Sequence, residues 1–139
     1  MADLYANFLE LWGLAYMGDF SKYMYKGGIY EIIFLFIFFV PLFVWILYYK
    51  VIDNIKLANI KSWSIILLIV FMVCGVFSYF YSYNEVTDYL FKKNIQKYDI
   101  TYIDVITFSI IAAIWSAAFS FVYSWVFKNL SIKARNIPF

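Results

Sequence analysis

The chain alternates between long apolar runs and short segments that carry nearly all of its charge. Three runs contain no charged residue, namely 32–49, 63–83 and 105–127. About 20 apolar residues cross a bilayer as a helix, and a helix satisfies its own backbone hydrogen bonds in lipid. The pattern therefore predicts three transmembrane helices at 32–49, 63–83 and 103–127, the third starting just before Asp104.

Residues 1–28 are interrupted by charges and cannot form a span, yet apolar residues recur there at helical spacing. These residues are Leu4, Phe8, Leu11, Trp12 and Ala15. Such a pattern is typical of an amphipathic helix in the membrane interface, and Gly27–Gly28 supplies a turn into the first span. A helix packed on a partner protein gives the same pattern, so both interpretations stay open. The predicted fold class is an all-α integral membrane protein, with three transmembrane helices preceded by an N-terminal amphipathic interfacial helix.

Two segments lie outside these elements. The connection 84–102 is too long for a tight turn, and its apolar residues predict one or two helical turns resting on the membrane surface. Thr101 and Asp104 match a capping box for the third span. The tail 128–139 is short and basic. Because we find no internal repeat or low-complexity linker, we treat 1–139 as a single polytopic membrane unit.

Proline and tryptophan positions predict finer features of the spans. Pro41 removes a backbone hydrogen bond from the first span and should kink it. Trp45, Trp63 and Trp125 lie near span ends, where an indole ring with a polar tip favours the membrane boundary. Trp115 lies in the middle of the third span, and we expect it to pack inside a complex.

Composition sets limits on chemistry. The chain is 65% hydrophobic and 14% charged, which lies outside the range of soluble domains. It has no His, and Cys74 is its single cysteine, so an intrachain disulfide and a His/Cys metal site are excluded. We therefore expect no cofactor, bound lipids aside. A serine nucleophile would lack its usual base, so we expect no enzymatic activity and no small-molecule substrate. A net charge of +2 with a single Arg does not favour a nucleic-acid partner.

The distribution of Lys and Arg predicts the orientation in the membrane. Segments 50–62 and 128–139 lie on one side and carry six positive charges in 25 residues. Segments 1–31 and 84–102 lie on the other side and carry five in 50 residues. The denser side should be cytoplasmic. This predicts an external N-terminus in a bacterial inner membrane, or in an organellar inner membrane with the C-terminus in the matrix.

Small side chains form two rows within SIIAAIWSAAFSFVYS, residues 109–124. One row is Ser109, Ala113 and Ala117, and the other is Ala112, Ser116, Ser120 and Ser124. Small residues let helices approach closely in lipid. The second span carries a matching row of Cys74, Ser78 and Ser82. We expect this row to pack on the Ser109 row within the chain. The first span has no Gly, Ala, Ser or Thr, so we expect the Ser116 row to face another protein.

These features favour a non-catalytic structural or anchoring subunit of a multi-subunit membrane complex, with lipids and other membrane subunits as partners. A bacterial trans-envelope secretion or injection assembly and a respiratory complex with a supernumerary subunit are suitable hosts. One alternative is a small homo-oligomeric pore, holin-like or a channel, whose lumen the serines would line. Another is a membrane adaptor or chaperone that docks a partner through its tail. The tail residues concerned are Lys133, Arg135, Pro138 and Phe139.

Overall fold

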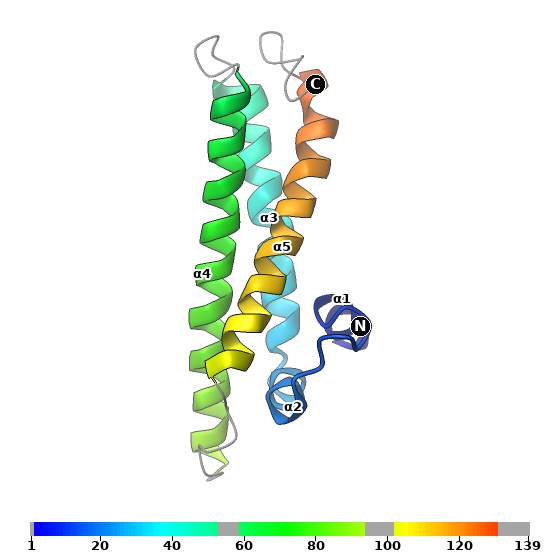
Figure 1. Cartoon of the computed structure of the whole chain (residues 1–139), viewed down its shortest axis with the longest axis vertical. Helices are drawn as coiled ribbons and strands as arrows, with labels where there is room; N and C mark the ends of the chain where they lie inside the picture. Colours follow the sequence, from blue (N-terminus) through cyan, green and yellow to red (C-terminus); the bar gives the residue numbers. More distant parts are fainter. Residues whose placement is uncertain (1, 53–58, 94–101, 131–139) are drawn as a thin grey trace.

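The computed structural model describes residues 2–52, 59–93 and 102–130 and arranges three long helices side by side (Figure 1). They are α3 (Ile29–Ile46), which continues into a π-helical segment η1 (Leu47–Ile52), α4 (Ile60–Lys92) and α5 (Tyr102–Phe127). A short 3-10 helix η3 (Lys128–Leu130) follows α5. All three long helices have the length and apolar composition needed to cross a membrane. The predicted fold class is therefore confirmed, and the protein is membrane-embedded.

The N-terminal region also forms helix, but in two short pieces instead of one. They are α1 (Ala2–Leu9) and α2 (Gly18–Lys26). Between them, Leu11 and Trp12 adopt left-handed φ angles of 52° and 57°, which end a right-handed helix. The apolar residues that we expected to share one face therefore do not, and Trp12 is 73% exposed.

The turn into the first span follows the prediction. Gly28 precedes α3 with a left-handed φ of 66°, a conformation that glycine adopts without strain. α3 then continues through Pro41, whose side chain is buried within the bundle. Asn59 begins α4, and its Oδ1 accepts a hydrogen bond of 2.8 Å from the Ser62 amide.

Each span buries a row of residues spaced about four apart. The buried rows are Ile29, Ile33, Ile37, Pro41 and Trp45 on α3; Val70, Cys74, Ser78, Ser82, Val86 and Leu90 on α4; and Phe108, Ala112, Ser116, Ser120 and Ser124 on α5, where Val105, Ser109 and Ala113 form a second buried row. A four-residue repeat exceeds the helical period of 3.6, so each row winds around its helix and favours crossed packing. In Figure 1, α5 crosses α3 accordingly.

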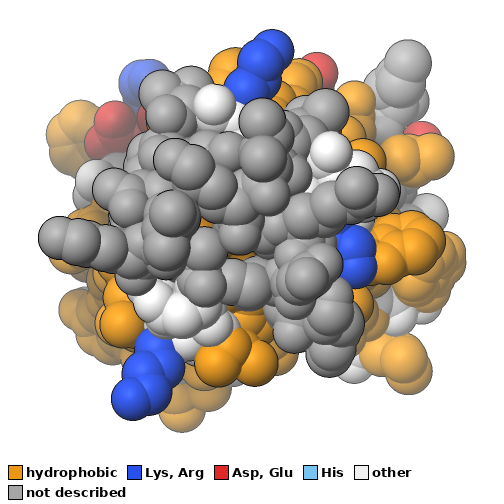
Figure 2. Space-filling view, turned by 90° about the horizontal axis from the view of Figure 1, so that it is seen from above, with side chains coloured by type: hydrophobic (Ala, Val, Ile, Leu, Met, Phe, Trp, Pro, Cys, Tyr) orange, Lys and Arg blue, Asp and Glu red, His pale blue; other side chains and the backbone are white. Residues whose placement is uncertain are grey.

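The outer surface of the bundle is apolar, as lipid contact requires. Seen along the bundle, Figure 2 shows hydrophobic side chains around the circumference and few charged ones. On α4 the exposed side chains include Leu68, Ile69 and Met72, and on α5 they include Ile110, Ile114 and Val122.

α4 is longer than the bilayer is thick. Its 33 residues correspond to about 50 Å at 1.5 Å per residue, whereas the hydrocarbon core measures roughly 30 Å. The prediction of separate surface turns in 84–102 is therefore wrong up to Lys92, because these residues continue α4. The remainder of that connection, including Thr101 of the predicted capping box, lies outside the described residues.

Candidate functional site

The row that we expected to face another protein lies inside this chain. Ala112, Ser116, Ser120 and Ser124 all have 0% exposure. The expectation is wrong because small residues do not require a small partner. Bulky side chains on α3 lie over α5, and aromatic pairs such as Phe34–Phe119 and Phe38–Tyr123 join the two helices. The alternative hypothesis of a pore assigned these serines to the lumen. They are instead buried inside a single chain.

Ser124 connects all three spans at one end of the bundle. Its Oγ lies 2.8 Å from the Tyr49 hydroxyl on η1 and accepts a hydrogen bond of 2.6 Å from the Trp63 indole on α4. Trp45 packs on Tyr49 and is fully buried. Trp45 lies next to the last residue of α3, with its ring centroid 5.9 Å from that of Trp63, whereas Trp125 is exposed near the end of α5. The assignment of these tryptophans to the membrane boundary stays a prediction.

The predicted contact between α4 and α5 exists, but with a different pairing. Cys74, Ser78 and Ser82 are fully buried, as expected. However, the Cys74 thiol interacts with Ser116, a member of the other row.

The Ser109 row meets a neighbouring residue of α4 instead. A Cβ at Gly75 would lie 3.2 Å from the Ala113 Cβ and 3.8 Å from the Ser109 carbonyl oxygen. Ala117 is only partly buried. Both rows of α5 thus pack against α4 within the chain, the Ser116 row beside Cys74 and the Ser109 row beside Gly75.

The tail residues proposed for docking cannot be placed. Lys133, Arg135, Pro138 and Phe139 lie outside the described residues.

The N-terminal helices create a site that the sequence did not reveal. α1 lies beside the spans in Figure 1, and its Phe8 ring stacks on Trp115 with a centroid distance of 3.9 Å. Trp115 is near the middle of α5, so α1 contacts the bundle along the length of this helix and not at its end. Trp115, which we expected to pack inside a complex, thus has a packing partner within the chain.

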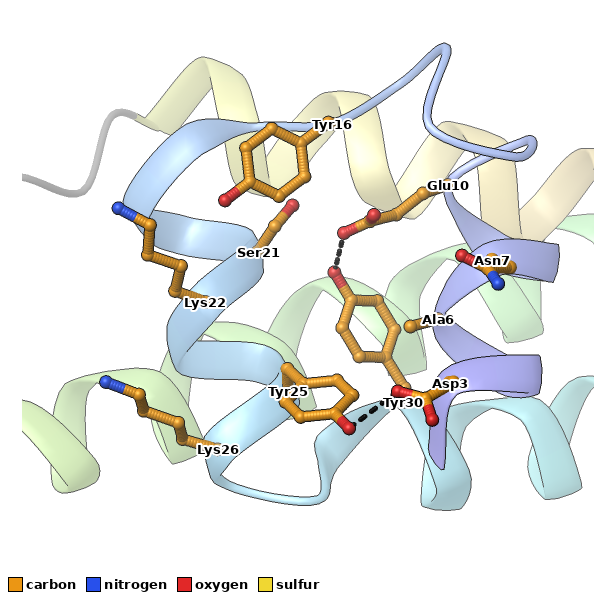
Figure 3. Close-up of a pocket in the computed structure, with 10 residues that line it drawn as sticks. All are labelled: Asp3, Ala6, Asn7, Glu10, Tyr16, Ser21, Lys22, Tyr25, Lys26 and Tyr30. Carbon is orange, nitrogen blue, oxygen red and sulfur yellow. Dashed lines mark hydrogen bonds between the residues drawn. The ribbon is translucent and has the colours of Figure 1, made fainter. Parts of the chain in front are cut away.

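α1, α2 and the start of α3 enclose a pocket of about 300 Å³ (Figure 3). Its lining combines carboxylates, phenols, two lysines and small polar groups. The lining residues are Asp3, Ala6, Asn7, Glu10, Tyr16, Ser21, Lys22, Tyr25, Lys26 and Tyr30.

A buried carboxylate lies at the base of this pocket. Glu10 is 8% exposed, and the hydroxyl of the buried Tyr30 donates a hydrogen bond to it. Ser21 is also buried and accepts a 3.0 Å hydrogen bond from the Met17 amide, which holds the start of α2 against the pocket. Glu10 directly follows the C-terminal end of α1, where the helix dipole disfavours a negative charge.

The other charges of the pocket are paired at its rim. The Tyr25 hydroxyl donates a 2.7 Å hydrogen bond to Asp3, and this bond raises the pKa of Tyr25. Lys22 forms a 2.6 Å ion pair with Asp19, whose hydrogen bond and charge raise the pKa of Lys22. In Figure 3 the ammonium groups of Lys22 and Lys26 point away from Glu10. The lysines therefore leave the Glu10 carboxylate without a cation.

Sequence reasoning treated Asp3 and Glu10 only as charges that interrupt an apolar run. Tyr30 lies 20 residues away from Glu10 in the sequence. Their contact depends on the left-handed turn at Leu11, Trp12 and Gly13, of which only Gly13 is a residue that commonly adopts this conformation. Among the described residues, no three His, Cys, Asp or Glu side chains gather as a metal site. Comparisons with protein-family models, curated proteins and solved structures found no match to this chain.

Proposed function

We propose that the protein is a non-catalytic structural or anchoring subunit of a multi-subunit membrane complex. The Ser116 row no longer supports this function, because the chain itself covers it. The observation that carries the proposal is the end of α4, which extends beyond the thickness of a bilayer as a rigid helix.

The protruding end of α4 is stabilised on one side and free on the other. Val86 and Leu90 are buried, and Tyr89 contacts Tyr23 of α2 with a centroid distance of 6.0 Å. On the opposite side Phe91 is 84% exposed and is followed by Lys92. Aromatic side chains are enriched in protein interfaces, and a braced helix loses little conformational entropy when it binds.

The charge distribution suggests where this contact would form. The end of α4 lies on the same side of the bundle as α2 (Figure 1), and the lysine distribution assigns that side to the exterior of a bacterial inner membrane or an organellar inner membrane. A trans-envelope secretion or injection assembly or a respiratory complex would offer partners there.

The test is purification of the tagged, full-length chain from its native membrane in mild detergent. The proposal expects at least one other membrane subunit at a fixed stoichiometry. Phe91→Ala should lower the yield of that subunit several-fold. Phe80→Ala is the matched control, because Phe80 is also exposed on α4 but lies within the span. A wild-type chain that purifies alone, or that conducts ions in liposomes, would refute the proposal.

A further inference from the structure

We propose that the pocket between α1 and α2 binds the ammonium head group of a zwitterionic phospholipid, with an acyl chain lying along the outer side of α1. This inference concerns a ligand and does not depend on the proposed structural function.

The first argument is an uncompensated charge. Glu10 is more than nine-tenths buried, and no described residue forms an ion pair with it. A buried carboxylate without a cation is costly even when it accepts a hydrogen bond. A ligand ammonium placed in the pocket would provide the missing charge.

The second argument is the aromatic lining. The rings of Tyr16, Tyr25 and Tyr30 border the pocket on three sides (Figure 3). Aromatic rings attract ammonium groups, and rings that surround a cation are a common way to recognise alkylammonium ligands. A metal ion binds oxygen, nitrogen or sulfur ligands in preference to aromatic rings, so the lining favours an organic cation.

The third argument is an apolar hollow on the other side of α1. It has a volume of about 440 Å³ and is lined by Asp3, Leu4, Asn7, Phe8 and Trp12. Asp3 and Asn7 also line the polar pocket, so the two hollows adjoin across α1. Because Phe8 contacts Trp115 near the middle of α5, the apolar hollow lies beside a helix with the length and composition of a membrane span. A polar pocket beside an apolar hollow matches an amphiphile.

The fourth argument concerns the phosphate. Lys26 lines the polar pocket, is exposed, and has no ion-pair partner among the described residues. A head group in which two carbons join an ammonium to a phosphate carries a positive charge for Glu10 and a negative charge for Lys26, and both residues line the pocket. The combination of one buried carboxylate and one rim lysine therefore fits phosphoethanolamine better than a monovalent amine or an anionic head group.

The test measures lipid retention by the full-length protein. Protein in micelles is mixed with equal amounts of phosphatidylethanolamine and phosphatidylglycerol, and bound lipid is counted by native mass spectrometry. We expect phosphatidylethanolamine to be retained about tenfold more, which corresponds to a modest difference in binding free energy. Glu10→Gln should abolish that preference while still accepting the Tyr30 hydrogen bond.

The controls separate a specific site from a change in net charge or folding. Glu31→Gln makes the same chemical change at an exposed carboxylate that does not line the pocket, so it should retain the preference. Trp12→Ala removes a side chain that is largely exposed and should leave the fold intact, yet it should lower retention of phosphatidylethanolamine several-fold by shortening the apolar hollow.

Three results would overturn the inference. They are equal retention of the two lipids by the wild type, an undiminished preference in Glu10→Gln, and thermal stabilisation by soluble phosphoethanolamine equal to that by the lipid. The last result would assign the pocket to a free solute and not to a membrane lipid.

Discussion

The three-helix bundle (α3, α4 and α5) and the N-terminal layer (α1 and α2) are held together by different interactions. In the bundle, some buried serines bond to carbonyls of their own helix, as Ser109 does to Val105 at 2.6 Å and Ser116 to Ala113 at 2.8 Å, and Ser78 and Ser120 have no hydrogen-bond partner among the described residues. The three helices also share one apolar cluster, to which Ile33 and Ile37 of α3, Cys74 of α4 and Ala112 of α5 belong. In the N-terminal layer, Glu10 and Asp3 are joined to α3 and α2 by tyrosine hydroxyls.

This difference has a physical basis in the solvent that each region meets. Lipid offers no hydrophobic driving force between apolar helices, so close packing supplies the adhesion. The N-terminal layer must place two carboxylates beside the membrane, and directional hydrogen bonds reduce the cost. The bundle should accordingly be sensitive to side-chain size, and the N-terminal layer to the loss of single hydroxyl groups.

The largest effect is expected from adding volume to the bundle core. Ser116→Leu combined with Ser120→Leu places two large side chains where exposure is zero. Overpacking costs about 1–3 kcal/mol per site, so the pair should lower the free energy of unfolding by roughly 2–6 kcal/mol. Denaturant titration in micelles measures this change. Ala118→Leu, at an exposed position of α5, should be nearly neutral. An unchanged stability together with the loss of a co-purifying subunit would instead place this row at an interface.

The second largest effect is expected from removing a single hydroxyl group in the N-terminal layer. Tyr30→Phe keeps the ring that packs on Phe108 but leaves Glu10 without its donor. A hydrogen bond to a charged group contributes about 1.5–3 kcal/mol, so local opening of α1 should become easier by that amount. Hydrogen exchange of residues 2–26 measures the effect, while exchange within α4 should stay unchanged. Tyr25→Phe is the control, because its bond to Asp3 is exposed. If both variants increase hydrogen exchange by the same amount, then the buried Tyr30–Glu10 bond contributes no more than the exposed Tyr25–Asp3 bond, contrary to this prediction.

Removing a hydroxyl from the bundle should have the smallest effect. Ser124→Ala deletes the contacts to Tyr49 and Trp63. Interhelical hydrogen bonds in membranes average about 0.6 kcal/mol each, so a loss of roughly 1 kcal/mol is expected. Ser64→Ala, at an exposed site near the start of α4, provides the reference in the same unfolding titration. A loss larger than that of Tyr30→Phe would reverse the proposed contrast between the two regions.

Several features of the fold were predictable because they depend on local properties. The positions of the three spans follow from the lengths of uncharged runs, and the turn at Gly28 follows from a residue that tolerates a left-handed φ. The burial of Cys74, Ser78 and Ser82 also followed from their spacing. In contrast, the break in the N-terminal helix occurs at Leu11 and Trp12, neither of which is a residue that usually ends helices.

The sequence by itself determined that this is an all-helical membrane protein with small-residue rows on two of its three spans, since hydrophobicity, length and period are properties of each segment alone. Only the tertiary structure decided which rows meet. Pairing depends on the rotation and crossing of whole helices, and these placed Ser116 beside Cys74 and Ala112 of α5 in one core cluster with Ile33 and Ile37 of α3. The same dependence on distant contacts explains why the pocket of Glu10 and Tyr30 emerged only when α1 was folded back against the spans.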